Sequence, residues 1–382
     1  MANAYPYLLL LIIFGFLAIL NIYFQNSKSK QLCTNICAYC IFVFFFGFRG
    51  FVAYDWTAYF DIFNKVPNLA ALSTNDITIL KTEPGFLLLI SICKTIVPNY
   101  IFFQFTCTLI NSTLLGLFVK RYTNNLPLVL AIFLAMSGIV FSIDLMRNSL
   151  AIFIFLNAIP FLEKRQFIPY IIICGIAATF HTSAIIYIPI YFLIHKKWNK
   201  KILISIFMIA NIIFLLHIPI FKPLISLIVG LLSDTAVQYV DAYMDFDSQG
   251  SNLGIGVLER LLTGILLFCY FNKLIQLRKS NIWVNCLFLY LATNLFLGEF
   301  RTISTRCSNL FIFAYWIVWI DLVKCIHYKS NKIIYITFIG MYCILKTYST
   351  CSGSMSQYYN VLLDHQTHNE RYIYFRQHQN DK

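Results

Sequence analysis

The sequence predicts an all-α polytopic membrane protein, and three observations lead to this fold class: the composition, the uncharged apolar runs and the placement of the basic residues. Of 382 residues, 59% are hydrophobic, 17% are aromatic and only 12% are charged. A soluble domain carries about 25% charged residues, so this chain has too little charge to cover a water-facing surface. The composition disfavours a single soluble enzyme, a disordered protein and a secreted disulfide scaffold.

Uncharged apolar runs predict about twelve transmembrane helices, because about 20 apolar residues are needed to cross a bilayer. The runs are 5–24, 31–48, 99–119, 122–143, 148–162, 166–180, 182–194, 202–218, 254–272, 281–298, 307–325 and 332–346. A further run, 84–97, contains Lys94 and is only about 21 Å long as a helix. We expect it to lie at the membrane surface, and we expect residues 1–382 to form a single integral membrane domain.

The distribution of basic residues predicts the orientation. One set of alternate loops is rich in Lys and Arg and has Glu163 as its only acid. Cytoplasmic loops carry such an excess, which accounts for the net charge of +13 without nucleic-acid binding. The basic residues of this set are Lys28, Lys30, Lys120, Arg121, Lys164, Arg165, Lys196, Lys197, Lys200, Lys201, Lys273, Arg278, Lys279, Lys324, Lys329 and Lys332. The loops 49–98 and 219–253 and the tail 347–382 are then predicted to lie outside.

Two ionisable residues border short apolar runs, so they are expected to lie below the outer membrane surface, unless the bilayer thins at Arg147. Arg147 precedes the run 148–162, and His181 separates 166–180 from 182–194. An ionisable residue at membrane depth indicates a functional site. The alternatives are an interfacial arginine whose long side chain reaches the surface and a hydrogen-bonded core histidine.

Three further arginines are predicted at the same depth and on the same side. Arg260 begins the helix after the second long loop, and Arg301 and Arg306 lie between 281–298 and 307–325. Neutralisation of Arg260 by Glu259, and of the later pair by Glu299, is the alternative. Several arginines with a histidine around one cavity suit an anionic substrate, because guanidinium binds phosphate oxygens with a fork of donors.

Motifs for other chemistries are missing from the sequence. There is no P-loop, no Gly-rich dinucleotide turn, no Gly-x-Ser-x-Gly elbow and no zinc spacing. Cys33, Cys37 and Cys40 share a helix face in an uncharged stretch without nearby His or carboxylate, so a metal site is not expected there. We expect no cofactor.

A set of short motifs, in order over about 50–310, resembles the EpsG-like family of Wzy-type O-antigen and polysaccharide polymerases. The family often has Gln where this chain has Asn148. The matching residues are Tyr54-Asp55, Tyr59-Phe60, Phe63, Glu83-Pro84-Gly85-Phe86, Met146-Arg147, Leu150-Ala151, Phe180-His181-Thr182-Ser183-Ala184, Arg260, Arg301 and Arg306.

The resemblance implies a fold similar to the GT-C glycosyltransferases, in the bacterial inner membrane, with the active site facing the periplasm. Such enzymes transfer an undecaprenyl-diphosphate-linked glycan chain onto a sugar hydroxyl of a new lipid-linked repeat, as in lipopolysaccharide biosynthesis. Arg147, with Arg260 and Arg301 or Arg306, would stabilise the departing diphosphate. His181 would bind a phosphate or position the acceptor.

The candidate general base is Asp55 or Glu83, since a carboxylate can accept the hydroxyl proton. The implied partners are the lipid-linked oligosaccharide, the bilayer, and a chain-length regulator and a flippase of the same pathway. Other assignments are an O-antigen ligase, which uses a similar donor, a polysaccharide flippase or transporter, and a membrane acyltransferase with His181 as base. No internal repeat of the kind common in transporters is visible.

Overall fold

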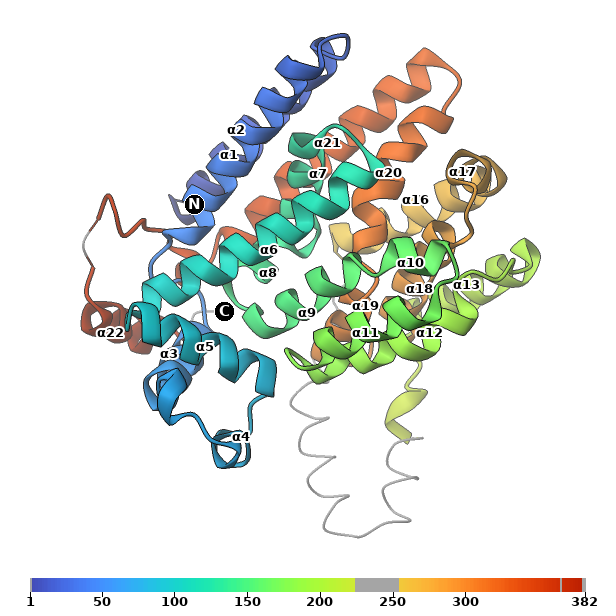
Figure 1. The fold of residues 1–382 in the computed structure, drawn as a ribbon. Coiled ribbons are helices and arrows are strands. Elements are labelled where there is room, and N and C mark those ends of the chain that lie inside the picture. Colours follow the sequence, from blue (N-terminus) through green and yellow to red (C-terminus); the bar gives the residue numbers. More distant parts are fainter. Residues whose placement is uncertain (1, 224–253, 365, 380–382) are drawn as a thin grey trace. The chain divides into compact units, whose positions relative to one another are not determined.

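A computed structural model of the protein describes residues 2–223, 254–364 and 366–379 (Figure 1). Within these ranges the chain is helical and contains no β-strand, apart from one isolated bridge between Arg49 and Asn360. The all-α prediction is therefore confirmed for the described residues. Most of the predicted loop 219–253 lies outside them.

The chain divides into two compact units, Met1–Tyr191 with Phe338–Lys382, and Phe192–Thr337. The first unit is discontinuous in sequence, because the last 45 residues return to it after the second unit is complete. This division does not test the prediction of one integral membrane domain, which stays a prediction.

The first unit begins with an antiparallel pair of long helices (Figure 1) and carries the candidate site. Its helices are α1 (Tyr5–Tyr23), α2 (Lys28–Gly47), α3 (Trp56–Lys65), η2 (Leu69–Ala71), α4 (Thr74–Leu80), α5 (Pro84–Ile96), α6 (Tyr100–Tyr122), α7 (Leu126–Phe133), η3 (Leu134–Gly138), α8 (Ile139–Ile143), α9 (Met146–Leu156), α10 (Ile159–Glu163), α11 (Phe167–Ala178), η4 (Thr182–Ile186) and α12 (Tyr187–Leu193). The predicted loop 49–98 is thus largely helical.

The second unit contains helices that follow the predicted apolar runs closely. They are α13 (Lys200–Leu215), α16 (Ile255–Cys269), α17 (Phe271–Arg278), α18 (Ile282–Phe296), α19 (Arg301–Asn309) and α20 (Phe313–Cys325). The helix α21 (Lys329–Cys351) leads back to the first unit, where η5 (Ser354–Ser356) and α22 (His368–His378) occupy the predicted tail.

Within the described residues, fewer helices than the twelve predicted crossings have the length and composition of a membrane span, so the number twelve stays a prediction. Five helices in the described residues have the length and composition to cross a membrane: α1, α2, α6, the segment Leu126–Ile143, and α21. Two bent pairs, α16 with α17 and α19 with α20, raise the number to seven if each is one span. The run 148–162 is divided at Asn157 into α9 of 11 residues and α10 of 5, about 16 and 8 Å long. Neither alone spans a hydrocarbon core of about 30 Å.

Candidate functional site

The motif Glu83-Pro84-Gly85-Phe86 starts α5 and docks it against the end of α11. Pro84 at the first helical position has the backbone angle that a helix start requires. The Gly85 N–H donates to the Thr179 carbonyl at 2.8 Å. A Cβ at Gly85 would lie 2.3 Å from Thr179 Oγ1, so only glycine allows this approach. Phe86 is fully buried and anchors the turn.

Glu83 links two other segments of the first unit. Its Oε2 accepts from Arg147 NH1 at 2.8 Å, an ion pair in which the glutamate side chain is 13% exposed and the arginine 29%. Its Oε1 accepts from the Thr182 backbone N–H at 3.4 Å. Both carboxylate oxygens are therefore occupied, and Glu83 holds the start of α9 beside the start of η4.

Arg147 keeps hydrogen-bonding capacity beyond this ion pair. Its Nε is buried with no hydrogen-bond partner among the described residues, and its guanidinium lies 6.0 Å from the centroid of the Tyr59 ring. Burial alone would lower the pKa of Arg147, but Tyr59 and Glu83 raise it. The arginine is thus a fixed cation with donors to spare, which suits the binding of an anion.

Tyr59 lies on α3 and is buried under the same arginine. Burial raises the pKa of Tyr59 to about 12, with a further increase from Asp55 that Arg147 partly offsets. At neutral pH the hydroxyl therefore keeps its proton. Tyr59 can orient Arg147 or donate a hydrogen bond, but it is not a base.

His181 caps the short helix η4, and its ring orientation follows from that role. The Nδ1 atom accepts from the Ser183 N–H at 3.1 Å, so a neutral ring carries its proton on Nε2. The Ser183 hydroxyl donates in turn to Asn148 Oδ1 at 3.4 Å. Asn148 thus ties α9 to the His181 turn, and His181 presents an N–H donor.

A second carboxylate, Asp144, fixes the start of α3 near Asp55. Its Oδ1 accepts from the backbone N–H groups of Tyr54 and Asp55 at 3.0 and 3.1 Å. Burial raises the pKa of Asp144 to about 6, and the neighbouring Asp55 adds to this, while the two backbone donors lower it. Asp144 therefore holds the segment of Asp55 through a carboxylate that is easily protonated.

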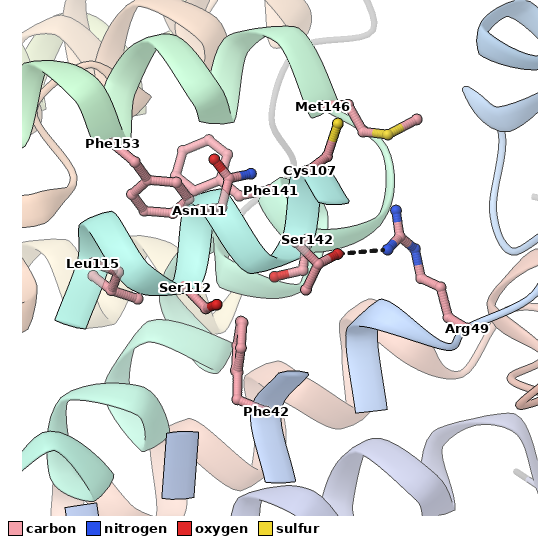
Figure 2. A pocket seen from close by; sticks show the side chains of 11 residues that line it. Phe42, Arg49, Cys107, Asn111, Ser112, Leu115, Phe141, Ser142, Met146 and Phe153 are labelled. Atoms are coloured by element: carbon pink, nitrogen blue, oxygen red, sulfur yellow. Dashed lines mark hydrogen bonds between the residues drawn. The ribbon is translucent and has the colours of Figure 1, made fainter. Parts of the chain in front are cut away.

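Arg49 braces the turn that carries Asp144 and Arg147. The side chain is 2% exposed, and it donates to the carbonyls of Phe46 and Ile143 and to Thr108 Oγ1. It lines a cavity of about 10 Å³ beside Asn111 (Figure 2). A cavity of this size is at the lower limit of what can hold one water molecule. The buried Oδ1 of Asn111 has no partner among the described residues.

The three later arginines belong to the second unit. Arg260 lies with its guanidinium 5.8 Å from the Phe214 ring centroid, and its Nε is buried with no partner in the described part of the chain. Phe214 lines a cavity of about 370 Å³ that also contains Lys222 and Glu299. Arg301 begins α19, and Arg306 is exposed near its end.

Of the predicted site residues, the structure brings Arg147 and Glu83 into direct contact and His181 next to the residue that Glu83 binds. Asp55 lies on the neighbouring start of α3. The sequence reasoning did not assign roles to Arg49 and Asp144. The sequence did offer a signal for each. Arg49 is a lone arginine two residues after an apolar helix, and Asp144 is an acid three residues before Arg147.

The described residues contain no group of three or more His, Cys, Asp or Glu side chains that could hold a metal ion.

Comparison with known proteins gives one assignment. No curated protein and no solved structure matches the chain. The EpsG family does match, over residues 32–362, a range that includes Glu83, Arg147 and His181. The protein therefore belongs to the EpsG family.

Proposed function

We propose that this protein is a polysaccharide polymerase, a membrane glycosyltransferase that joins lipid-linked repeat units. Membership of the EpsG family indicates a polymerase-like function of this kind. The observation that carries the proposal is that Glu83 joins three family motifs, since it pairs with Arg147 and accepts a hydrogen bond from Thr182 in the turn that starts at His181. A motif that served only the fold would not need to hold a partly exposed arginine.

The reaction is a substitution at the anomeric carbon of the growing chain. The hydroxyl oxygen of the incoming repeat forms the new bond to that carbon, and the bond to undecaprenyl diphosphate breaks. The hydroxyl proton passes to a base, and the bond electrons leave with the diphosphate. Negative charge grows on the departing oxygen, where prearranged donors stabilise it most.

Arg147 is the proposed donor to the departing diphosphate, held in place by Glu83 and Tyr59. We assign Glu83, whose two oxygens accept hydrogen bonds from Arg147 and Thr182, to positioning, and we assign Asp55, the other predicted candidate, to the role of base. His181, with its proton on Nε2, donates to a phosphate or orients the acceptor hydroxyl. Arg260, Arg301 and Arg306 stay the predicted further ligands of the diphosphate.

For the membrane, the topology and the fold in which this reaction takes place, we keep the predictions made from the sequence. We place the enzyme in the bacterial inner membrane, with about twelve crossings and a GT-C-like fold. The site faces the periplasm, and the lipid tail enters from the bilayer. A flippase supplies the repeat and a chain-length regulator limits the product.

An O-antigen ligase is the second candidate, because it uses the same class of donor. Deletion of the gene distinguishes the two. Loss of a polymerase leaves the lipopolysaccharide core capped with a single repeat, whereas loss of a ligase leaves bare core and accumulated lipid-linked polymer. Glycan ladders on gels from the deletion and complemented strains measure the difference, and the second pattern would overturn the polymerase assignment.

A further inference from the structure

A groove of about 410 Å³ lies between the N-terminal half of α2 and the C-terminal half of α6, within the first unit. Leu32, Ile36 and Tyr39 line it from α2, and Gly116 and Val119 from α6. Lys28 and Lys120 lie at the basic end of the two helices and also line the groove. Gln31 and Asn35 add polar groups from α2. The groove is therefore mostly apolar along the helices and cationic where they meet the loops.

The basic residues at the cationic end form no ion pair within the described parts of the chain. They are Lys28, Lys30, Lys120 and Arg121, and all four are exposed. The sequence has no acid in residues 1–54 or 84–143. Glu163 lies close to this end and accepts a hydrogen bond from the Tyr122 hydroxyl at 3.1 Å. The N-terminus of α2 adds the positive end of a helix dipole.

The apolar walls belong to helices that have the composition of membrane spans. Both α2 and α6 are among these candidates, and Leu32 and Ile36 are 57% and 52% exposed. A Cβ at Gly116 would meet no atom within 4 Å, so the glycine leaves open space along α6. The Tyr39 hydroxyl and Thr113 Oγ1, 2.8 Å apart, close the groove further along the helices.

We propose that this groove binds one anionic phospholipid, with the phosphate between Lys28 and Lys120 and an acyl chain beside Gly116. A basic pocket between membrane helices is the type of site that holds anionic headgroups. A free phosphate would use only the charged end and would leave the apolar walls uncovered. The site is separate from the Arg147 cluster, and the inference does not depend on the proposed function.

The test measures lipid binding to the purified full-length protein in detergent. Native mass spectrometry and thermal unfolding are followed with dioleoyl phosphatidylglycerol, dioleoyl phosphatidylcholine or inorganic phosphate added. We expect one retained phosphatidylglycerol and a raised unfolding midpoint, with neither effect from the other two probes. Equal retention of phosphatidylcholine, or protection by inorganic phosphate alone, would overturn the proposal.

Two sets of variants separate the headgroup contact from the groove. Lys28→Gln with Lys120→Gln should weaken phosphatidylglycerol binding about 10- to 30-fold. Gly116→Leu, which fills the groove and suits a helix better than glycine, should also remove the retained lipid. The matched control is Lys196→Gln with Lys197→Gln, which removes the same charge from exposed residues of the second unit.

The control should bind like the unchanged protein. An equal loss in the control would mean that general surface charge attracts the lipid, and an unchanged Gly116→Leu would mean that no chain occupies the groove; either result contradicts the site. If Gly116→Leu does not fold, the comparison of the Lys28→Gln and Lys120→Gln variant with its control decides whether the site exists.

Discussion

The two units each contain an arginine–carboxylate pair, and the pairs differ in the number of hydrogen bonds that the guanidinium donates to the carboxylate. In the second unit, Arg278 binds Asp321 with two bonds, Nε to Oδ2 at 2.5 Å and NH2 to Oδ1 at 2.8 Å. The aspartate is 1% exposed, and Lys324 approaches it as well. In the first unit, Arg147 gives Glu83 a single bond and is itself 29% exposed.

This difference separates a structural ion pair from one that is prepared for a ligand. A two-bond pair in a buried site uses the planar fork of the guanidinium completely. The single bond at Arg147 fixes its position and leaves donors for a third group. At Arg147 we therefore expect that a substitution which keeps only the positive charge does not preserve function. At Arg278 we expect the ion pair to contribute to stability.

The largest effect is expected from Arg147→Lys. Lysine keeps the charge but cannot present a planar fork to two phosphate oxygens. Loss of one transition-state donor costs about 2.7–4 kcal/mol, or 100- to 1000-fold in rate. We expect Arg147→Lys to fail nearly as badly as Arg147→Ala, with glycan ladders collapsed to one or two repeats in a deletion strain at matched membrane levels.

The control for this experiment is the thermal unfolding midpoint of each variant. Arg147→Lys should stay close to the unchanged protein, because lysine can still pair with Glu83. A normal ladder from Arg147→Lys would remove the two-oxygen contact from the mechanism, and a normal ladder from Arg147→Ala would remove Arg147 from the site.

The next effect is on stability rather than activity. Arg278→Gln leaves the buried Asp321 with Lys324 alone, and breaking a buried pair by removing one partner costs about 3–5 kcal/mol. We expect about 3 kcal/mol, because Lys324 compensates in part. Adding Asp321→Asn should recover much of the loss. Thermal unfolding in detergent measures the double-mutant cycle, and a loss that Asp321→Asn leaves unchanged would contradict it.

The third effect concerns Asp144 and pH. Its pKa rises from the usual 3.8 to about 6 in the folded protein, so between these values the folded chain holds a proton that the unfolded chain releases. Stability should therefore fall as pH rises from about 4 to about 6. Asp144→Asn keeps an oxygen acceptor for Tyr54 and Asp55 and should lose this dependence. Unfolding midpoints at pH 4, 5, 6 and 7 measure it, and equal pH slopes would refute the assignment.

The positions of most helices could be predicted from the sequence, because a membrane-type helix is an apolar run between polar ends. The run 5–24 became α1 and 99–119 became α6. The internal breaks were not predicted. Met136 and Ser137 leave the helical conformation, with Ser137 at φ 66°, and α17 turns 71° from α16. Such bends depend on packing against neighbours, which hydropathy does not record.

The sequence predicted which residues belong to the candidate site better than it predicted which of them are in contact. Arg147, His181, Glu83 and Asp55 were named from their positions and from the family resemblance. The pairing of Glu83 with Arg147 joins residues 64 apart in sequence, and local patterns carry no information at that distance. The roles of Arg49 and Asp144 were not predicted for the same reason, because their hydrogen-bond partners come from four different segments of the chain.

The return of the C-terminal segment to the first unit has a consequence for the order of folding. Arg371 donates to the Phe51 carbonyl at 3.0 Å, and Gly50 donates to the Tyr359 carbonyl at 3.1 Å. These contacts fix the backbone just before α3, and they join residues about 300 positions apart in the chain. Contacts this far apart form late, because closing a long loop costs entropy before any contact compensates. During synthesis, the unit made first is thus completed last, after the second unit has emerged.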